Sequence, residues 1–569
     1  MRVVAWLDRH WRVLLVLLMA WMAVLLVIQA RGKYIWHDEI YTILGSRLGI
    51  LSLWRASLDG MDLSPPLNTV FTRFVHGIAG EGHMTTRIPP MAGFLTAVAV
   101  VFVLVRRRTS VIVALGSAFF LCSTPAWRYA IEARGYGLAL GLFALAIYGW
   151  SEAARGRQPV KHLALMAAAL AAGVWTHYYF VFAFVPIAAA ELTRQLVTRR
   201  FDAAPWTAFT LAGALTMPLA SLARVAGAQR STFWARSDMI GVGDLYSFFF
   251  GGVAPYRLVF AAIGGVAMLE IVRRSRTRRW PRRLSAPDLV LCLMCLAVPA
   301  IAVLLGSFTQ VFTDRYVVFG AAGLALALPL LVWSVLPPEG IGDWLAASVL
   351  AASFVALSAQ VIEGRRPPPN QLRDRPFLVD LLKGSLPVAM TGGVAYLEMW
   401  WYASDEMRPH AIYLADPAGQ RRDTMTDTVD RNYLALGRWS PVPIVRITDF
   451  MKTHKHFWLY SFGNNWAERS LRLAGATLRE WGRESPAAGI LYEVYLPDKP
   501  RSSRRARGAP AGAERGTGVP APRPGSGRPE PTSKGASDGV GGPGRLRAEG
   551  ASASLAEAQR RRAGRSPPV

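Results

Sequence analysis

Cysteine is nearly absent from this chain, whose 569 residues include only three. Cys122, Cys292 and Cys295 all lie in apolar segments or at their ends. Cys292 and Cys295 form a CxxC pair, but the surrounding run LVLCLMCLAV offers neither the turn nor the solvent access that a zinc or redox motif requires. We interpret all three as small apolar helix residues. Residues 363–497 contain no cysteine, so disulfides do not hold that segment together.

Acidic residues are also scarce, because 38 Asp and Glu stand against 64 Lys and Arg, which gives a net charge of +26. A charge of this size is typical of nucleic-acid-binding proteins. Here, however, the basic residues are mostly arginines that cluster between apolar runs, which is the pattern of the positive-inside rule. With 52% hydrophobic residues, the chain is too apolar for an ordinary soluble protein. We therefore expect an integral membrane protein with no nucleic-acid partner.

The N-terminus lacks the form of a cleavable signal peptide. Its first apolar run, residues 13–30, is longer than a signal h-region of ~7–15 residues and can cross a hydrocarbon core of ~30 Å. We expect it to remain as the first membrane-spanning helix. Comparable runs predict about eleven transmembrane helices, at residues 13–30, 90–105, 110–126, 137–150, 162–176, 178–192, 206–222, 256–272, 287–306, 316–334 and 344–361.

The arginine clusters predict the orientation of these helices. Basic residues precede the first run and follow the second, fourth, sixth and eighth, so all of them lie on one side if the N-terminus is cytoplasmic. With an odd number of crossings, the C-terminal region then lies outside. We expect a multi-pass protein of the cytoplasmic (inner) membrane, with a membrane domain at 1–362 and a long outer loop at 31–89. Within this loop, stretches beginning at Ile40 and Leu67 are typical of short amphipathic helices in the interface.

The C-terminal third differs in composition from the membrane domain. Residues 363–497 alternate strand-like and helix-like stretches, which predicts a soluble, extracytoplasmic α/β domain with a largely parallel sheet. No glycine-rich phosphate loop follows any of these strands, so we assign this domain no catalytic role. Residues 498–569 form a basic tail rich in Gly, Pro and Arg that contains no aromatic residue, and we expect this tail to be disordered.

Polar residues of interest gather at the outer ends of the predicted helices. Two adjacent carboxylates, Asp38 and Glu39, follow the first helix directly. Ionisable residues at membrane depth are costly and are functional candidates by default. The candidate site residues are Asp38, Glu39, Arg87, Glu132, Arg134, Tyr136, Arg315 and Tyr316.

These side chains suit the transfer of a sugar from a lipid phosphate. A guanidinium group matches the oxygens of a phosphate, so Arg134 or Arg315 would bind the anionic head of the donor. A carboxylate such as Asp38 would take the proton of an acceptor hydroxyl as a general base. Negative charge that develops on the leaving phosphate needs cations nearby.

Each candidate also has an ordinary structural interpretation. Asp38 and Glu39 are the kind of residues that favour the first turn of a helix. Arg134 and Arg315 can serve as interfacial anchors or pair with neighbouring acids. The stretch from His177 to Tyr179 fits an interfacial aromatic belt. On the residues alone, both interpretations stay open.

Four short motifs nevertheless resemble those of a known family. In chain order they are WHDEIY at 36–41, SPPL at 64–67, RIP at 87–89 and EARGY at 132–136. Their order, spacing and sidedness resemble the dolichyl-phosphate-mannose–protein mannosyltransferase-like membrane glycosyltransferases of family 39, a superfamily that includes the aminoarabinose transferase of lipid A. The resemblance covers residues 10–220, and Asp314 to Tyr316 extends it.

The resemblance implies a GT-C-like fold and an inverting transfer from a polyprenyl-phosphate sugar at the outer face. The acceptor would be an envelope glycan, lipid or protein. Asp38 matches the catalytic acid of the family, with Glu39 as its motif neighbour, while Glu132 and Arg134 match the groups that contact acceptor and phosphate. Relatives usually have His-Pro-Pro-Leu where this chain has Ser64. Members differ in whether they use a divalent metal, so we assign no metal and no cofactor.

Two other classes of protein remain as alternatives. A transporter or flippase for a lipid-linked glycan needs substrate-facing charges along its helices, whereas the charges here lie at the helix ends. A non-catalytic membrane scaffold would act through residues 363–497 and would not require Asp38.

Overall fold

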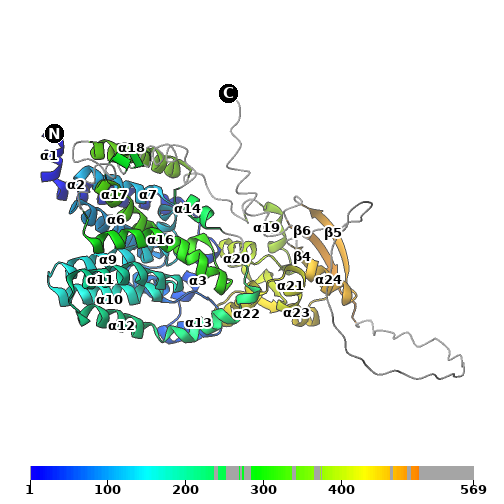
Figure 1. Ribbon diagram of the computed structural model, residues 1–569. Helices are drawn as coiled ribbons and strands as arrows, with labels where there is room; N and C mark the ends of the chain where they lie inside the picture. Colours follow the sequence, from blue (N-terminus) through cyan, green and yellow to red (C-terminus); the bar gives the residue numbers. More distant parts are fainter. Residues whose placement is uncertain are drawn as a thin grey trace, which may run out of the picture.

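The computed structural model describes residues 2–235, 241–250, 284–335, 341–363, 375–461, 465–483 and 489–498, together with a few single positions between these ranges. Long helices lie side by side in one half of the molecule, and a mixed sheet with its helices forms the other half (Figure 1). Short helices from the outer loops and from the C-terminal region lie between the two halves.

Among the described residues, seven helical stretches are long and apolar enough to cross a membrane. They coincide with seven of the eleven predicted runs, and the chain is a polytopic helical membrane protein as expected. The stretches are α2 (Trp11–Gly32), η1 (Thr85–Arg87) with α6 (Ile88–Arg106), α9 (Tyr136–Ala154), α10 (Pro159–Thr176), η2 (Tyr178–Ala183) with α11 (Phe184–Thr198), α16 (Ala286–Thr309) and α18 (Ile341–Glu363).

Three further predicted runs form helices that differ from a simple span. The run at 206–222 is a bent pair, α12 (Ala203–Thr216) and α13 (Leu219–Ala228), with 59° between its halves. The runs at 110–126 and 316–334 form the shorter apolar helices α7 (Val111–Ser123) and α17 (Gly320–Val335). The predicted run 256–272 falls largely outside the described residues.

Glycine allows α6 and α9 to pack with their backbones in contact. A Cβ atom at Gly93 would lie 2.4 Å from the Cα of Leu138, and one at Gly141 would lie 2.4 Å from the carbonyl oxygen of Gly93. A Cβ atom at Gly137 would lie at the same distance from the carbonyl oxygen of Pro90. Small residues are how membrane helices approach this closely. The contact brings the outer ends of α6 and α9 together.

The loop after α2, which the charge pattern predicts to lie on the outer face, folds into short helices, as its amphipathic stretches predict. They are α3 (His37–Ser46), α4 (Ile50–Leu58) and α5 (Leu67–Ala79). Asp38 and Glu39 lie in the first turn of α3, where carboxylates interact favourably with the helix dipole. Ile50 and Leu51 of α4 and Phe74 and Ile78 of α5 are exposed, as expected for helices that rest on a bilayer surface.

The C-terminal region contains a six-stranded sheet with the order β3-β2-β1-β4-β6-β5. The strands are β1 (Val388–Met390), β2 (Ala411–Ala415), β3 (Ile444–Arg446), β4 (His456–Ser461), β5 (Thr477–Arg483) and β6 (Ile490–Tyr495). The pairs β1–β2, β1–β4 and β2–β3 are parallel, whereas β4–β6 and β5–β6 are antiparallel. The expectation of a largely parallel sheet therefore holds for one side only, because β5 and β6 form a hairpin at the other edge.

Helices connect and cover these strands. They are α19 (Pro376–Lys383), α20 (Gly393–Tyr402), α21 (Pro417–Thr424), α22 (Thr428–Trp439), α23 (Ile447–Thr453) and α24 (Asn465–Leu473). α20 and α22 face the membrane half (Figure 1).

The C-terminal region packs firmly on the outer loops. Ile40, Tyr41 and Ile43 of α3 share one apolar core with residues of α20 and α22. The hydroxyl of Thr232 in η3 (Arg230–Thr232) donates to Asp427 at 2.6 Å, and the indole of Trp439 donates to Asp59 at 2.9 Å. These contacts place α22 directly over the outer ends of the membrane helices.

Candidate active site

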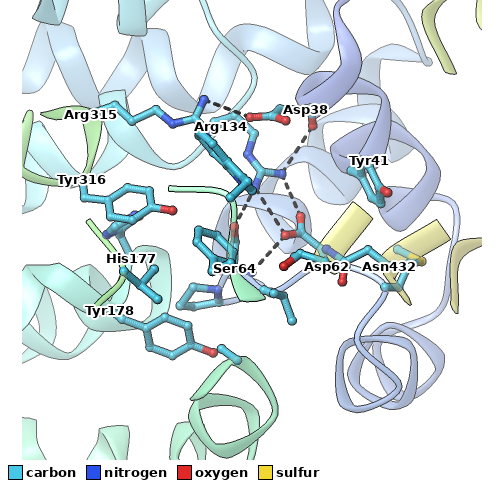
Figure 2. A pocket seen from close by; sticks show the side chains of 18 of the residues that line it. Asp38, Tyr41, Asp62, Ser64, Arg134, His177, Tyr178, Arg315, Tyr316 and Asn432 are labelled. Atoms are coloured by element: carbon cyan, nitrogen blue, oxygen red, sulfur yellow. Dashed lines mark hydrogen bonds and ion pairs between the residues drawn. The ribbon is translucent and has the colours of Figure 1, made fainter. Parts of the chain in front are cut away.

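A cavity lies between the outer loops, the ends of the membrane helices and α22. It encloses about 1010 Å³, including the solvent at its mouth. Figure 2 shows two arginines and two aspartates that meet at one side of it, with aromatic and histidine side chains opposite. Its wall includes His37, Asp38, Tyr41, Asp62, Ser64, Arg134, Tyr136, His177, Tyr178, Tyr179, Trp234, Arg315, Tyr316, Thr428, Asn432 and Tyr433.

Asp38 occupies the centre of this charged side. Arg315 donates to its Oδ2 at 3.1 Å, and the ring Nδ1 of His37 donates to its Oδ1 at 2.9 Å. Burial opposes ionisation of Asp38, but the attraction of Arg315, the hydrogen bond from His37 and the charge of Arg134 outweigh it. These groups hold the pKa of the Asp38 carboxyl well below its usual range. With 18% of its side chain exposed, Asp38 is an ionised carboxylate that a ligand can reach.

Arg315 reaches Asp38 from a different part of the chain. It lies in η5 (Asp314–Val317), just before α17. Its guanidinium carbon lies 5.3 Å from the ring centre of Trp234 and 6.0 Å from that of Trp36, so two indoles hold it in place. Its buried Nε has no hydrogen-bond acceptor among the described residues. Arg315 also lines the cavity, so its guanidinium can contact a bound anion.

Arg134, at the outer end of α9, is the second cation of the cavity. It donates to Asp62 at 2.7 Å and 3.3 Å, to the hydroxyl of Ser64 at 2.6 Å and to the backbone carbonyl of Asp38 at 3.3 Å. Burial opposes the charge of Arg134, but Asp62 and Asp38 outweigh it and raise the pKa of the guanidinium further. Ser64 is thus a direct partner of this arginine.

The opposite wall consists of rings. His177 lies 4.8 Å from Tyr316 and 5.7 Å from Tyr136, measured between ring centres. Burial and the two nearby arginines lower the pKa of His177 to about 3, so its imidazole is neutral at physiological pH. Burial raises the pKa of Tyr316 to about 12, which keeps its hydroxyl protonated. This wall offers neutral hydrogen-bonding groups and flat apolar faces.

The structure places Glu39 and Arg87 outside the cavity, although both were candidates for direct contact with substrates. Their side chains are 0% exposed and form a two-point ion pair with both distances 2.8 Å. Arg87 also donates to the carbonyls of Ala30, Lys33 and Tyr34, and Glu39 accepts from the amide of Ala133 at 2.8 Å. The pair therefore fastens the chain before α3 to the ends of α6 and α9.

Glu132 is likewise absent from the cavity wall. It is buried, and its nearest cation is Lys33 at 3.8 Å. Burial raises the pKa of Glu132 despite the attraction of Lys33. Of the eight sequence candidates, the structure thus brings Asp38, Arg134, Tyr136, Arg315 and Tyr316 into one cavity, and it places the other three behind its wall.

Sequence reasoning did not anticipate several residues of the wall, among them Asp62 and one face of α22. Asp62 lies in a short connection between α4 and α5, where an aspartate is ordinary in a turn. The others are Thr428, Val429, Asn432 and Tyr433 of α22, and the ring of Tyr433 stacks on His37 at 6.0 Å. Because Val429, Tyr433 and Leu436 recur at helical spacing, α22 resembles an ordinary core-facing helix in the sequence.

The side chains of the cavity give no basis for assigning a metal ion. Within the described ranges, no group of three or more His, Cys, Asp or Glu side chains lies close enough together to hold one. The acids of the cavity are instead paired with arginines.

Comparisons with known proteins identify a shared fold. No protein-family model matches the sequence, and no curated protein matches it either. The crystal structure of ArnT from Cupriavidus metallidurans in the apo state is similar, with a TM-score of 0.53, 12% sequence identity, and coverage of 85% of this chain and 98% of that one. The structure of the same protein bound to undecaprenyl phosphate gives a TM-score of 0.50, 13% identity and the same coverage.

A more distant match is the oligosaccharyltransferase of Archaeoglobus fulgidus tethered to an acceptor peptide, with 13% identity and coverage of 86% of this chain and 74% of that one. Its TM-score of 0.38 is too low to establish a common fold. The similarity to ArnT over nearly its whole length confirms the expected class: a polytopic helical protein with a GT-C-like fold and a strand-containing C-terminal region.

The buried ion pair between Glu39 and Arg87 leads to a prediction about stability. Glu39→Gln keeps the shape of the side chain but leaves Arg87 without a counter-ion in a closed environment, so we expect a loss of about 3–5 kcal/mol in the free energy of unfolding. The loss should appear as a lower melting temperature of the purified protein in detergent.

Glu81→Gln is the matched control for this prediction. Glu81 forms a two-point pair with Arg47 in which the side chains are 35% and 44% exposed, so its removal should cost less than about 1 kcal/mol. Equal losses in the two variants would contradict the structural role of the buried pair.

Proposed function

We propose that this protein is an integral-membrane glycosyltransferase that moves a sugar from a polyprenyl-phosphate donor to an envelope glycan, lipid or protein, with inversion at the sugar carbon. The observation that carries the proposal is the meeting of Asp38, Arg134 and Arg315, from three separate segments, in one cavity above the membrane helices. The fold shared with ArnT, a protein that has been crystallised with undecaprenyl phosphate, supports a lipid-phosphate donor.

The two arginines supply the binding site for the phosphate. Guanidinium groups bind phosphate oxygens at two points and remain charged. Without a ligand, Arg315 is neutralised by Asp38 and Arg134 by Asp62. The donor phosphodiester that enters the cavity carries one negative charge, and its oxygens can share the same two cations with the carboxylates.

Asp38 then acts as the general base. The acceptor hydroxyl attacks the sugar carbon, a new carbon–oxygen bond forms, and the bond from that carbon to the phosphate oxygen breaks. The hydroxyl proton passes to Asp38, and the lipid monophosphate leaves with the bonding electron pair, stabilised by Arg134 and Arg315. A single displacement of this kind inverts the configuration of the carbon.

Donor binding raises the basicity of Asp38. Before the donor binds, the nearby cations hold the pKa of this carboxyl low. A bound phosphate offsets part of their field, so the pKa of Asp38 rises when the donor is present. The base therefore becomes effective only in the presence of the leaving group that needs it.

We assign the cavity to the outer face of the cytoplasmic membrane, with the N-terminus in the cytoplasm. The arginine clusters between the apolar runs support this orientation. A flippase for lipid-linked glycans and a non-catalytic scaffold are the alternatives. Neither class requires a carboxylate beside two arginines at the helix ends.

Asp38→Asn should reduce transfer by about 10²- to 10⁴-fold, the usual contribution of a general base. The amide keeps the size of the side chain and one acceptor oxygen but accepts a proton poorly. The measurement is mass spectrometry of envelope glycans and lipids in cells that lack the gene and carry the variant in its place. Asp405→Asn, at a side chain that is 95% exposed, should restore the missing sugar fully. Full restoration by Asp38→Asn would remove this residue from the mechanism and favour the alternatives.

Arg134→Ala should weaken donor binding about ten- to a hundredfold, because a charge-assisted hydrogen bond is worth about 1.5–3 kcal/mol. Turnover on bound donor should fall less. Binding of undecaprenyl phosphate to the purified full-length protein measures the first effect, and Arg157→Ala on the other side of the membrane is the control. An unchanged affinity in Arg134→Ala would count against its role at the phosphate.

Arg315→Gln should move the acid limb of activity to higher pH. The wild-type carboxylate stays ionised down to acidic pH because its pKa is depressed, so kcat/KM for the donor should be flat through the mildly acidic range. Removal of the cation raises the pKa of Asp38, which is then protonated, and inactive as a base, at a higher pH. Identical pH profiles for the two proteins would argue against the control of Asp38 by Arg315.

A further inference from the structure

We propose that a second cavity, at the seam between the outer loops and α20, binds a neutral saccharide unit. It encloses about 750 Å³, including open solvent, and none of its wall residues belongs to the cavity of Asp38. Arg47 and Glu81 form one side, and Trp400, Trp401 and Arg408 form the other. The inference does not depend on the transfer reaction, because binding alone tests it.

The aromatic side of this seam cavity is held rigidly. The guanidinium carbon of Arg47 lies 5.4 Å from the ring centre of Trp401, and that of Arg408 lies 5.4 Å from the ring centre of Trp400. Arg408 also donates to the carbonyls of Trp400 and Trp401 at the end of α20. Trp401 is the partly exposed indole of the two, and a flat ring fixed beside a planar polar group is suited to the combined apolar and hydroxyl-bearing faces of a sugar ring.

The charges favour a neutral polyhydroxylated ligand over an anion. Trp400, Arg47 and Arg408 only donate hydrogen bonds, whereas the carboxylate of Glu81 only accepts them. Glu81 also cancels the charge of Arg47 through bonds of 2.7 Å and 2.9 Å, and Asp405 offsets the charge of Arg408 at 2.7 Å. A phosphate accepts only and would meet repulsion from Glu81. A sugar hydroxyl both donates and accepts, so it can engage both kinds of group.

The seam cavity is connected to the catalytic loop. The hydroxyl of Tyr402, another wall residue, accepts from the amide of Ile35 at 2.6 Å, and Glu398 of α20 accepts from the amide of His37 at 3.2 Å. Ile35 precedes Asp38 by three residues, which span at most about 11 Å when extended. A saccharide held here would lie close enough to be part of the same glycan acceptor.

The test is binding of the full-length protein, in lipid nanodiscs, to an immobilised panel of neutral glycans that includes mannans, glucans, galactans and arabinans. We expect retention of at least one glycan. Trp401→Ala should weaken it about tenfold or more, as expected for loss of an aromatic anchor. Glu81→Gln should weaken it as well, because the amide offers one acceptor oxygen in place of two and lacks the negative charge that strengthens a hydrogen bond from a hydroxyl.

Two matched controls should leave retention unchanged. Trp481→Ala removes an exposed indole from β5, at the far edge of the sheet, and Glu406→Gln removes an exposed carboxylate of the same region without touching the cavity. Failure to retain any neutral glycan, or retention that Trp401→Ala leaves unchanged, would overturn the proposal. Binding of phosphatidylglycerol vesicles that increases in Glu81→Gln would also overturn it, because it would identify an anionic lipid as the occupant.

Discussion

The ion pair between Glu39 and Arg87 is the interaction on which the geometry of the cavity depends. It is closed to solvent, and it joins the loop after α2, the start of α6 and the amide of Ala133 just before α9. Asp38 is the neighbour of Glu39, and Arg134 follows Ala133, so the pair sets the positions of one carboxylate and one arginine of the cavity. The two adjacent acids therefore differ in role: Glu39 holds the surrounding segments together, and Asp38 lines the cavity, where we propose that it acts as the base.

The charged side chains of the cavity balance one another before any ligand binds. Each cavity arginine has a carboxylate partner, Asp38 for Arg315 and Asp62 for Arg134. Such pairing lets two cations occupy a partly buried site without large desolvation costs. Under the proposed function, an incoming phosphate would share the same cations and so change the electrostatic environment of both carboxylates. The two cations are already in place before it binds.

Much of the fold follows from the sequence because a bilayer demands long apolar runs, and seven of the predicted runs match membrane-length helices. Four strands are also evident from their apolar stretches, whereas β3 is too short and β5 too polar to stand out. The residues that line the cavity were harder to predict from the sequence. Which of Arg87 and Arg134 faces the cavity depends on how α6 and α9 pack, and that packing is a property of the folded bundle. The same holds for α22, whose apolar stripe gives no sign that it covers a site.

The glycine contact between α6 and α9 has a consequence for how distant variants would behave. Gly141 lies five residues beyond Tyr136, roughly 7–8 Å deeper along the helix. Even a methyl group at that depth has no room, because the carbonyl oxygen of Gly93 already occupies its place. The helices would have to separate, and the spacing of the guanidinium of Arg134 from the loop of Asp38 would change with them. Under the proposed function, a substitution of Gly141, deep in the contact between α6 and α9, would therefore weaken binding of the donor phosphate in the cavity at the end of these helices.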